Sequence, residues 1–591
     1  MTGPHDLDPA DLNDAALRDH AVAAARGDAP FDLLIRGGRV ADVAMQEIRA
    51  ADVGIVGPLI ASVHAPGARA DAARTLDATG LIVAPGLIDA HMHIESSMVT
   101  PAVYAGAVLP RGTTTVVWDP HEFGNVAGLA GVDWALAEAA RSPLRILTLA
   151  PSCVPSAPGY ETAGADFGPA EIEALLARPG IHGLAEVMDM GAVTSRAPRM
   201  RGIVQAGLAS GKPVCGHARG LTGAALQAYA AAGVTSDHEL TSAEDLLEKL
   251  RAGLWVELRG SHPHLLPEIA RALAALPACP PTLTLCTDDV FPDDLAQSGG
   301  LDALLRLLVA EGLPPLRALQ AATFNAAQRL GRPDLGLVAP GRRADLALFR
   351  DLESFAPAHV LRDGRPPALP VAASARPDFG APAPPRFAPA DFETPATGPT
   401  ARIATIDRPR FTQWGERQVG VRDGRLALPP DLTRIAVIHR HGRAPAIPRI
   451  GFLSGWGAWR GAFATTVSHD SHNLTVFGHA PEDLAAAANA VAAQGGGMAV
   501  AQGGRVTALL PLPVGGLVSD APLEDVAAAF RAVREAMDAV VDWQPPYLVF
   551  KALVGATLAC NAGPHQTDLG IADSHAGRLL TSPILEDGLP A

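Results

Sequence analysis

The segment from Pro85 to Pro101 contains two histidines, His91 and His93, at the end of a short apolar run. Side chains two residues apart on a strand point to the same face, so both imidazoles can converge on one metal ion. A single His-x-His pair also arises by chance, and its rings often only satisfy each other's hydrogen bonds. The rest of the chain decides between a metal site and a structural pair, because a metal site needs further ligands.

Further candidate ligands stand at the ends of other apolar runs. These are Glu186 in Gly-Leu-Ala-Glu-Val, His217 in Val-Cys-Gly-His, His238 in Ser-Asp-His-Glu and Asp288 in Cys-Thr-Asp-Asp. Each alone has an ordinary explanation, as a polar residue at a loop mouth or as a helix cap. Together with His91 and His93 they make six such residues at equivalent positions, which is improbable by chance. We therefore predict a centre that binds two divalent cations bridged by a carboxylate.

The elements that must position these residues alternate between apolar runs and helical stretches. This is the pattern of βα units and of a parallel sheet. Eight runs predict a closed (β/α)8 TIM-type barrel, in which functional residues sit at the carboxyl ends of the strands. Helices over 301–311 and 316–330 are expected to complete it. The eight runs are 87–94, 112–119, 144–152, 181–188, 213–218, 235–239, 254–261 and 283–289.

We expect further units on either side of this α/β barrel, which spans 85–335. Apolar spacing over 7–26 predicts helix, and short alternating runs from residue 31 onward predict antiparallel strands. In the C-terminal unit, strands are expected near 403–407, 417–421, 434–438, 474–477 and 498–510, with helices near 481–493 and 522–540. The expected units are a helical extension (1–30), a composite β-sandwich (31–84 with 336–363), a Pro/Ala-rich linker or surface wrap (364–400) and a C-terminal α+β domain (401–591).

Composition excludes several classes of protein. A net charge of -15 argues against a nucleic-acid surface, which needs concentrated Lys and Arg. The five cysteines are scattered and form no Cys-x-x-Cys pair, which suits a reducing compartment. The first residues lack the pattern of a signal peptide, and no apolar run reaches the roughly 18 to 20 residues of a membrane helix. We therefore expect a cytoplasmic protein without membrane or nucleic-acid partners.

Several long strings carry a family resemblance. They are His93-Ile-Glu-Ser-Ser-Met-Val-Thr-Pro, Asp119-Pro-His-Glu-Phe-Gly-Asn-Val, Gly216-His-Ala-Arg-Gly-Leu-Thr-Gly, Cys286-Thr-Asp-Asp-Val-Phe-Pro-Asp-Asp-Leu and Ser468-His-Asp-Ser-His-Asn. With the ligand order, they make the chain resemble the amidohydrolase superfamily and, within it, the bacterial adenine deaminases. The resemblance implies hydrolysis of adenine to hypoxanthine and ammonia, with two Mn²⁺ or Fe²⁺ ions as cofactors. Family members often bridge the ions with a carboxylated lysine. None of the three lysines of this chain lies in the fourth predicted strand, which leaves Glu186 as the bridge.

The ligand set predicts roles for individual residues. One ion is assigned to His91, His93 and Asp288, the other to His217 and His238, and Glu186 is shared. The cations would lower the pKa of a bridging water, and Asp288 would accept its proton and pass it to the leaving ammonia. The predicted catalytic residues are Asp288, Glu186 and Glu122.

A proton donor is also needed near N1 of the ring. The candidates are Glu122, His121, Glu95 and Glu239, each of which could instead orient a ligand histidine. Asp119 and His121 could also bind a further ion. The predicted substrate pocket contains Ser96, Arg259, Asp289, His469 and His472.

The C-terminal histidines are less well defined. Many family members carry Glu-Arg-His-His-Gly where this chain has His439-Arg-His-Gly. The loop around His469 either reaches over the barrel mouth and completes the substrate pocket, within one chain or across a subunit boundary of a homo-oligomer, or is an ordinary polar turn. Both interpretations stay open.

Two other functions remain as alternatives. A related hydrolase acting on a cyclic amide, such as a dihydropyrimidine, would share the metal site. A non-enzymatic scaffold would lack ligands, and none is missing. The single-zinc deaminases are excluded, because His93-Ile-Glu95 is followed by no Pro-Cys-x-x-Cys.

Overall fold

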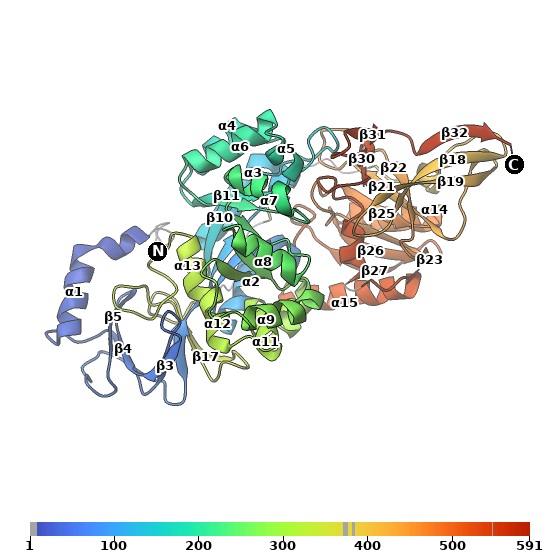
Figure 1. The fold of residues 1–591 in the computed structure, drawn as a ribbon. Coiled ribbons are helices and arrows are strands. Elements are labelled where there is room, and N and C mark those ends of the chain that lie inside the picture. Colours follow the sequence, from blue (N-terminus) through green and yellow to red (C-terminus); the bar gives the residue numbers. More distant parts are fainter. Residues whose placement is uncertain (1–8, 370–375, 381–384, 546–547, 591) are drawn as a thin grey trace.

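The computed structural model describes residues 9–369, 376–380, 385–545 and 548–590. Three bodies follow one another along the chain (Figure 1). A small β unit at the N-terminal end lies on one side of a central barrel, and a large C-terminal sheet unit lies on the other side. The barrel is therefore in contact with added structure at both of its ends.

All eight predicted barrel strands are present and parallel. Two hydrogen-bonded runs, β12-β11-β10-β9-β8 and β13-β14-β15, meet at two seams. At one seam the Thr235 N–H donates to the carbonyl of Val214 at 2.9 Å; at the other the His93 N–H donates to the carbonyl of Asp288 at 3.1 Å. The predicted (β/α)8 class is confirmed. The strands are β8 (Leu87–Met92), β9 (Thr113–Trp118), β10 (Arg145–Ala150), β11 (Ile181–Val187), β12 (Val214–Gly216), β13 (Ser236–Asp237), β14 (Trp255–Arg259) and β15 (Leu283–Cys286).

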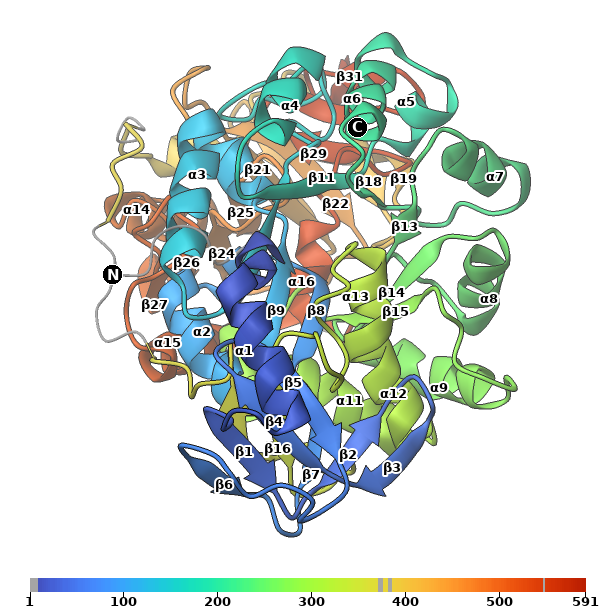
Figure 2. The ribbon, with the colours of Figure 1, turned by 90° about the vertical axis from the view of Figure 1, so that its left-hand side faces the viewer.

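Helices surround the strands (Figure 2). Buried apolar side chains of the helices pack against those of the strands. The expected helix 316–330 is divided into α12 (Pro315–Gln320), a π-helical turn (Ala321–Asn325) and α13 (Ala326–Arg329). Within this turn the side-chain amide of Asn325 donates to the carbonyl of Leu283 at 2.8 Å. This hydrogen bond joins the turn to the start of strand β15. The other main barrel helices are α2 (Pro101–Val108), α3 (His121–Arg141), α4 (Pro169–Leu176), α5 (Met190–Thr194), α6 (Pro198–Ala209), α7 (Gly223–Ala231), α8 (Ala243–Arg251), α9 (Leu266–Ala274), α10 (Pro292–Gln297) and α11 (Leu301–Ala310).

The N-terminal unit consists of two small sheets, with strand orders β5-β4-β1-β6 and β17-β16-β7-β2-β3. After the barrel the chain returns to this unit, because β16 pairs antiparallel with β7. Helix α1 (Ala15–Arg26) packs against β4 and β5 through Ala21 and Ala24. The strands are β1 (Leu33–Arg36), β2 (Arg39–Asp42), β3 (Glu47–Ala50), β4 (Asp52–Val56), β5 (Leu59–His64), β6 (Thr75–Asp77), β7 (Ile82–Pro85), β16 (Leu346–Phe349) and β17 (Pro357–Leu361). Residues 1–8 of the predicted extension lie outside the described residues.

The described part of the Pro/Ala-rich segment runs along the surface of the protein. The ring of Phe379 lies 6.1 Å from that of Phe123 on α3. Phe387 and Phe392 pack with α14 (Pro481–Ala493). At these described positions the segment packs against the barrel and the C-terminal unit.

The C-terminal unit is built on a ten-stranded sheet, with α14 and α15 (Leu523–Val540) on opposite faces. The single strand expected over 498–510 is wrong. It is a hairpin of β26 and β27, because Gly503 and Gly504 both adopt the left-handed backbone of a tight turn. The sheet strands are β18 (Thr400–Asp407), β19 (Gln413–Arg422), β20 (Arg425–Ala427), β21 (Leu432–Ile438), β22 (Arg449–Ser454), β24 (Ala462–Thr465), β25 (Leu474–Gly478), β26 (Gly497–Gln502), β27 (Arg505–Pro511) and β32 (Ile584–Leu589).

Shorter elements complete this unit. Helix α16 lies between the sheet and the barrel mouth. The elements are α16 (Val549–Val554), β23 (Ala458–Trp459), β28 (Val541–Asp542), β29 (His565–Thr567), β30 (Gly570–Asp573) and β31 (Arg578–Leu580).

Hydrogen bonds between Asp89 and Thr287 join β8 to the residue after β15, and we predict that they stabilise the fold. The buried Asp89 carboxylate accepts hydrogen bonds from the Thr287 N–H at 2.9 Å and from its hydroxyl at 2.6 Å. Asp89→Ala leaves both donors buried and unpaired, which costs about 1–3 kcal/mol of unfolding free energy. We expect a lower thermal unfolding midpoint, measured by calorimetry. Asp77→Ala, at an exposed carboxylate, is the control, and an equal midpoint in both variants would contradict this account.

Candidate metal centre and pocket

The six predicted ligands meet at the carboxyl ends of five barrel strands. All six side chains are buried. His91 lies on β8 with His93 directly after it, and Glu186 lies near the end of β11. The others follow β12, β13 and β15, and they are His217, His238 and Asp288. The structure therefore brings together all the residues that the spacing of the sequence singled out.

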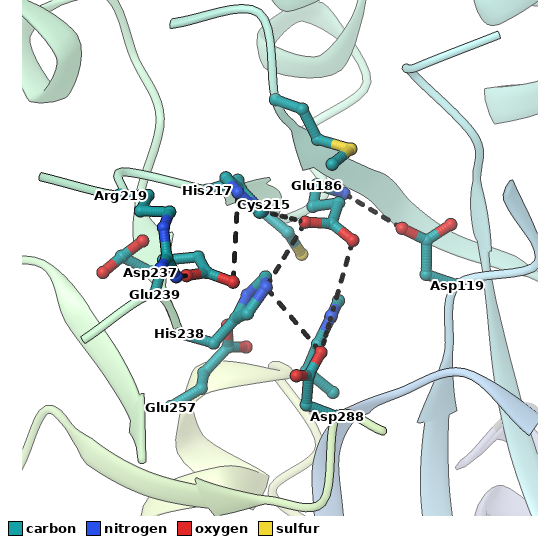
Figure 3. Close-up of polar contacts among 12 residues, drawn as sticks. Asp119, Glu186, Cys215, His217, Arg219, Asp237, His238, Glu239, Glu257 and Asp288 are labelled. Carbon is teal, nitrogen blue, oxygen red and sulfur yellow. Dashed lines mark hydrogen bonds and ion pairs between the residues drawn. The ribbon is translucent and has the colours of Figure 1, made fainter. Parts of the chain in front are cut away.

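Glu186 is at the centre of this group (Figure 3). Its Oε2 lies 2.6 Å from Nδ1 of His217 and 3.3 Å from Nε2 of His238. Its Oε1 lies 3.3 Å from Nε2 of His93. Burial opposes ionisation, but His238 and His217 hold the pKa of Glu186 well below its usual value. One ionised carboxylate is thus shared by imidazoles from three different strand ends.

Asp288 faces the same imidazoles from the opposite side. Its Oδ1 lies 3.6 Å from Nε2 of His93, and its Oδ2 accepts hydrogen bonds from Arg259 at 2.7 Å and Ser261 at 2.9 Å. Its backbone is left-handed, with φ of 59°, which aspartate tolerates better than most residues. Although burial acts against it, Arg259 and His93 keep the pKa of Asp288 well below normal, so the side chain is ionised.

This donor set suits a divalent cation. The candidate ligand groups include His91, His93 and Asp288, and separately Glu186, His217 and His238. Burial and the neighbouring His238 and His93 lower the pKa of His91 to about 3, so its imidazole is neutral, as metal binding requires. Imidazole and carboxylate ligands without thiolate fit Mn²⁺, Fe²⁺ or Zn²⁺.

A second layer of carboxylates surrounds the histidines. Glu122 Oε2 lies 3.4 Å from Nδ1 of His93, and Asp119 Oδ2 lies 3.1 Å from Nδ1 of His121. Glu95 accepts a hydrogen bond from the Trp118 indole at 2.7 Å. Glu95 and Glu122 do not line the pocket, which places both behind the first layer of side chains.

Glu239 does line the pocket, but it is engaged by two arginines. Its carboxylate pairs with Arg219 and Arg259, each at 2.6 Å. Burial raises the pKa of Glu239, but the two guanidinium groups outweigh this effect and hold the pKa far below its usual value. An ionised Glu239 has no proton to give, so the structure does not support it as the donor to N1.

Four of the five predicted pocket residues line a cavity above the ligands. They are Ser96, Arg259, Asp289 and His469. The fifth prediction, His472, is wrong. Its buried ring lies behind that of His469, with a centroid distance of 5.1 Å, and its Nδ1 faces the backbone N–H of Ser468.

The C-terminal unit supplies one wall of this cavity. The loop between β24 and β25 carries His469, and helix α16 carries Phe550 and Lys551. Lys551 Nζ lies 3.0 Å from Oδ2 of Asp289, a residue that follows the last barrel strand. The loop therefore reaches the barrel mouth of its own chain.

Sequence reasoning did not assign some residues of the site. Lys551, Arg219 and Phe291 line the cavity, and the Glu257 carboxylate lies 3.8 Å from Nδ1 of His238. Glu257 was detectable as an acidic residue inside an apolar strand. Lys551 carries no local signal, because a single lysine on a short helix is common.

Comparisons with known proteins agree with this picture. Residues 82–366 match the model of the amidohydrolase family, and residues 409–578 match that of the adenine deaminase C-terminal domain. Adenine deaminase 2 of Rhizobium meliloti (strain 1021) is 64% identical over 98% of this chain and 99% of its own length. Adenine deaminase of Klebsiella pneumoniae (strain 342) is 51% identical over 97% of each chain, and that of Moorella thermoacetica is 40% identical over 87% of this chain and 90% of its own. The chain therefore belongs to the adenine deaminase family of the amidohydrolase superfamily.

Proposed function

We propose that this chain hydrolyses adenine to hypoxanthine and ammonia. The observation that carries the proposal is the buried Glu186 carboxylate, which three histidines share at the floor of a pocket. Relatives 40–64% identical to this chain are named as adenine deaminases, which supports the same substrate. They favour adenine over the cyclic amide considered from the sequence.

Two divalent cations, Mn²⁺ or Fe²⁺, are proposed as cofactors. His91, His93 and Asp288 would hold one, His217 and His238 the other, and Glu186 both. When bound, such ions lower the pKa of a water molecule and so supply a nucleophile near neutral pH. The part of the chain that is described keeps these donors buried and close together, which supports the assignment.

Asp288 is the proposed proton carrier. It is ionised, and its Oδ1 faces the histidine cluster and the pocket, where the attacking water must lie. Arg259 and Ser261 hold its other oxygen, which fixes the orientation of the carboxylate. As the water oxygen bonds to C6 of adenine, Asp288 can take a proton from that water. It can then give the proton to the amine as the bond between C6 and the amine nitrogen breaks.

The cavity wall offers both apolar and polar groups to a purine. The rings of Phe291 and Phe550 lie 5.5 Å apart, edge to face, and line the cavity. Asp289 is fixed by Ser96 at 2.6 Å and by Lys551 at 3.0 Å. An ionised Asp289 can accept a hydrogen bond from a purine N–H, and Lys551 can donate to a ring nitrogen.

Four wider proposals concern the role, location and partners of the chain. The reaction would serve purine metabolism, since adenine is its substrate. A cytoplasmic location is supported by the five cysteines, all of which are free thiols. Among the described residues no helix has both the length and the apolar character of a membrane span. The chain is expected to form a homo-oligomer and to bind no nucleic acid.

The first test is turnover of adenine by protein reconstituted with Mn²⁺. We expect the ultraviolet spectrum of adenine to change to that of hypoxanthine, with release of one ammonia per base. Adenosine and dihydrouracil, assayed in parallel, should be turned over far more slowly. Comparable activity on dihydrouracil would instead favour the cyclic-amide alternative.

Substitution of the two central carboxylates tests their roles. Asp288→Asn removes the proton acceptor and should lower kcat/KM for adenine by at least about 100-fold, because general acid–base catalysis contributes roughly 10²–10⁴. Glu186→Gln should lower both activity and bound Mn²⁺, measured by elemental analysis. Asp133→Asn, an exposed carboxylate on α3, is the control. Activity of Asp288→Asn close to that of the wild type would exclude Asp288 as the base.

Lys551 tests the contribution of the C-terminal wall. Loss of a hydrogen bond from a charged group costs roughly 1.5–3 kcal/mol, or about 10- to 100-fold in affinity. Lys551→Met should therefore raise KM for adenine by about that factor and change kcat less. An unchanged KM would mean that Lys551 only supports Asp289.

Metal binding should stabilise the folded chain. The unfolded chain has no preformed site, so at a free Mn²⁺ concentration 100 times Kd the ions should contribute about 2.7 kcal/mol per site. We expect the unfolding midpoint of chelator-treated protein to rise with added Mn²⁺ in thermal scans. Glu186→Gln should show a smaller rise; an equal rise would place the stabilising ions elsewhere.

A further inference from the structure

A second cluster of ligand-type side chains lies beside the proposed centre, between the barrel and the C-terminal unit. His121 and Glu122 are the first residues of α3, and His469 and Asp470 come from the loop between β24 and β25. The deamination described above uses none of these four as a metal ligand. Glu122, His121 and Asp470 are each no more than 2% exposed.

Four donor atoms of this cluster face one another at similar distances. Nε2 of His121 lies 3.7 Å from Oδ1 of Asp470 and 4.0 Å from Oε1 of Glu122. Nδ1 of His469 lies 3.7 Å from the same Asp470 oxygen and 3.9 Å from the same Glu122 oxygen. The donor atoms of His121, Glu122 and His469 thus form one candidate ligand group, all within 4.8 Å of one another, and Asp470 adjoins both imidazoles.

These distances are too long for direct hydrogen bonds between the four groups. They fit donors that share one ion, because two ligand atoms at roughly 2.0–2.2 Å from a metal lie about 3 to 4 Å apart. A cluster of ion pairs formed by protonated histidines would instead draw each N–H to within about 3 Å of a carboxylate. The geometry thus favours a cation at the centre over salt bridges alone.

The buried donor atoms also lack hydrogen-bond partners among the described residues. This applies to both carboxylate oxygens of Glu122, to Nε2 of His121 and to Oδ1 of Asp470. The other oxygen of Asp470 faces the Cys560 thiol at 3.9 Å, which leaves Oδ1 directed at the cluster. An unsatisfied buried carboxylate is costly, and a bound cation would remove that cost.

His121 links this cluster to the proposed centre. Its Nδ1 lies 3.1 Å from Asp119 and 3.7 Å from Oε1 of Glu186, on the side of the ring opposite the cluster. The Asp119 carboxylate can thus orient the Nδ1 side of the ring and leave Nε2 directed at the cluster, as carboxylates do behind metal-bound histidines. The sequence predicts a further ion near Asp119 and His121. We now assign His121 as a ligand of that ion and Asp119 as the residue that orients the His121 ring.

We propose that His121, Glu122, His469 and Asp470 bind a third divalent cation, distinct from the two ions of the proposed deaminase centre. Two imidazoles and two carboxylates suit Mn²⁺, Fe²⁺ or Zn²⁺. Because the barrel and the C-terminal loop each supply two ligands, the ion would fasten the loop over the pocket, where His469 forms part of the wall. The inference does not depend on adenine being the substrate.

Anomalous diffraction from crystals of the full chain soaked in Mn²⁺ tests the site directly. We expect three peaks per chain, the third among these four side chains. Only two peaks at saturating Mn²⁺, with none among the four, would overturn the proposal. Three filled sites without adenine turnover would count against the deaminase proposal alone, so the two failures are distinguishable.

Elemental analysis of gel-filtered protein provides the second test. Wild-type chain should retain three Mn²⁺ and Asp470→Asn two; three in the variant would overturn the assignment. Glu161→Gln is the matched control, because Glu161 is a buried carboxyl outside the cluster whose pKa is raised by burial to about 8, so glutamine resembles its protonated form. It should retain three ions. If Asp470→Asn does not fold, Glu122→Gln replaces it, with the same expected loss of one ion.

Discussion

The structure of the site depends on the burial of an ionised Glu186 among imidazoles from three strand ends. A charge removed from water must be matched by partners at short range, or the group becomes neutral instead. Those partners can only converge if the strands close into a ring whose carboxyl ends meet at one edge. Barrel closure and site assembly are therefore one requirement, and the hydrogen bonds across the β8–β15 seam serve both.

A barrel alone leaves these ligands open at its mouth. In this chain the opening is narrowed by α16 and by the loop between β24 and β25, which bring Phe550, Lys551 and His469 over the proposed metal ligands. Removing water around charged groups strengthens every electrostatic interaction among them. The C-terminal unit would thus contribute to the proposed chemistry without supplying any of the six proposed ligands.

The sequence was sufficient for the features that depend on local patterns. Eight apolar runs predicted eight strands, and His91, His93, Glu186, His217, His238 and Asp288 were identified because each ends or follows such a run. It was insufficient where function depends on contacts between distant segments. Lys551 meets Asp289 across 262 positions, and nothing within either segment specifies that meeting. His472 was misplaced for the related reason that neighbours in a polar loop can face opposite ways.

Charge balance connects the two groups of ligands. Buried carboxylates around the pocket include Glu186, Asp288, Glu122, Asp119 and Asp470, whereas the nearby guanidinium of Arg259 is already shared between Asp288 and Glu239. Although burial opposes it, neighbouring carboxylates raise the pKa of His93, His121 and His238 above the usual range, so this cluster of side chains calls for positive charge. Divalent cations neutralise two charges each and accept the very lone pairs that these side chains present. The same electrostatic requirement that calls for ions at Glu186 extends along His121 to Glu122 and Asp470, and so to the loop that covers the pocket.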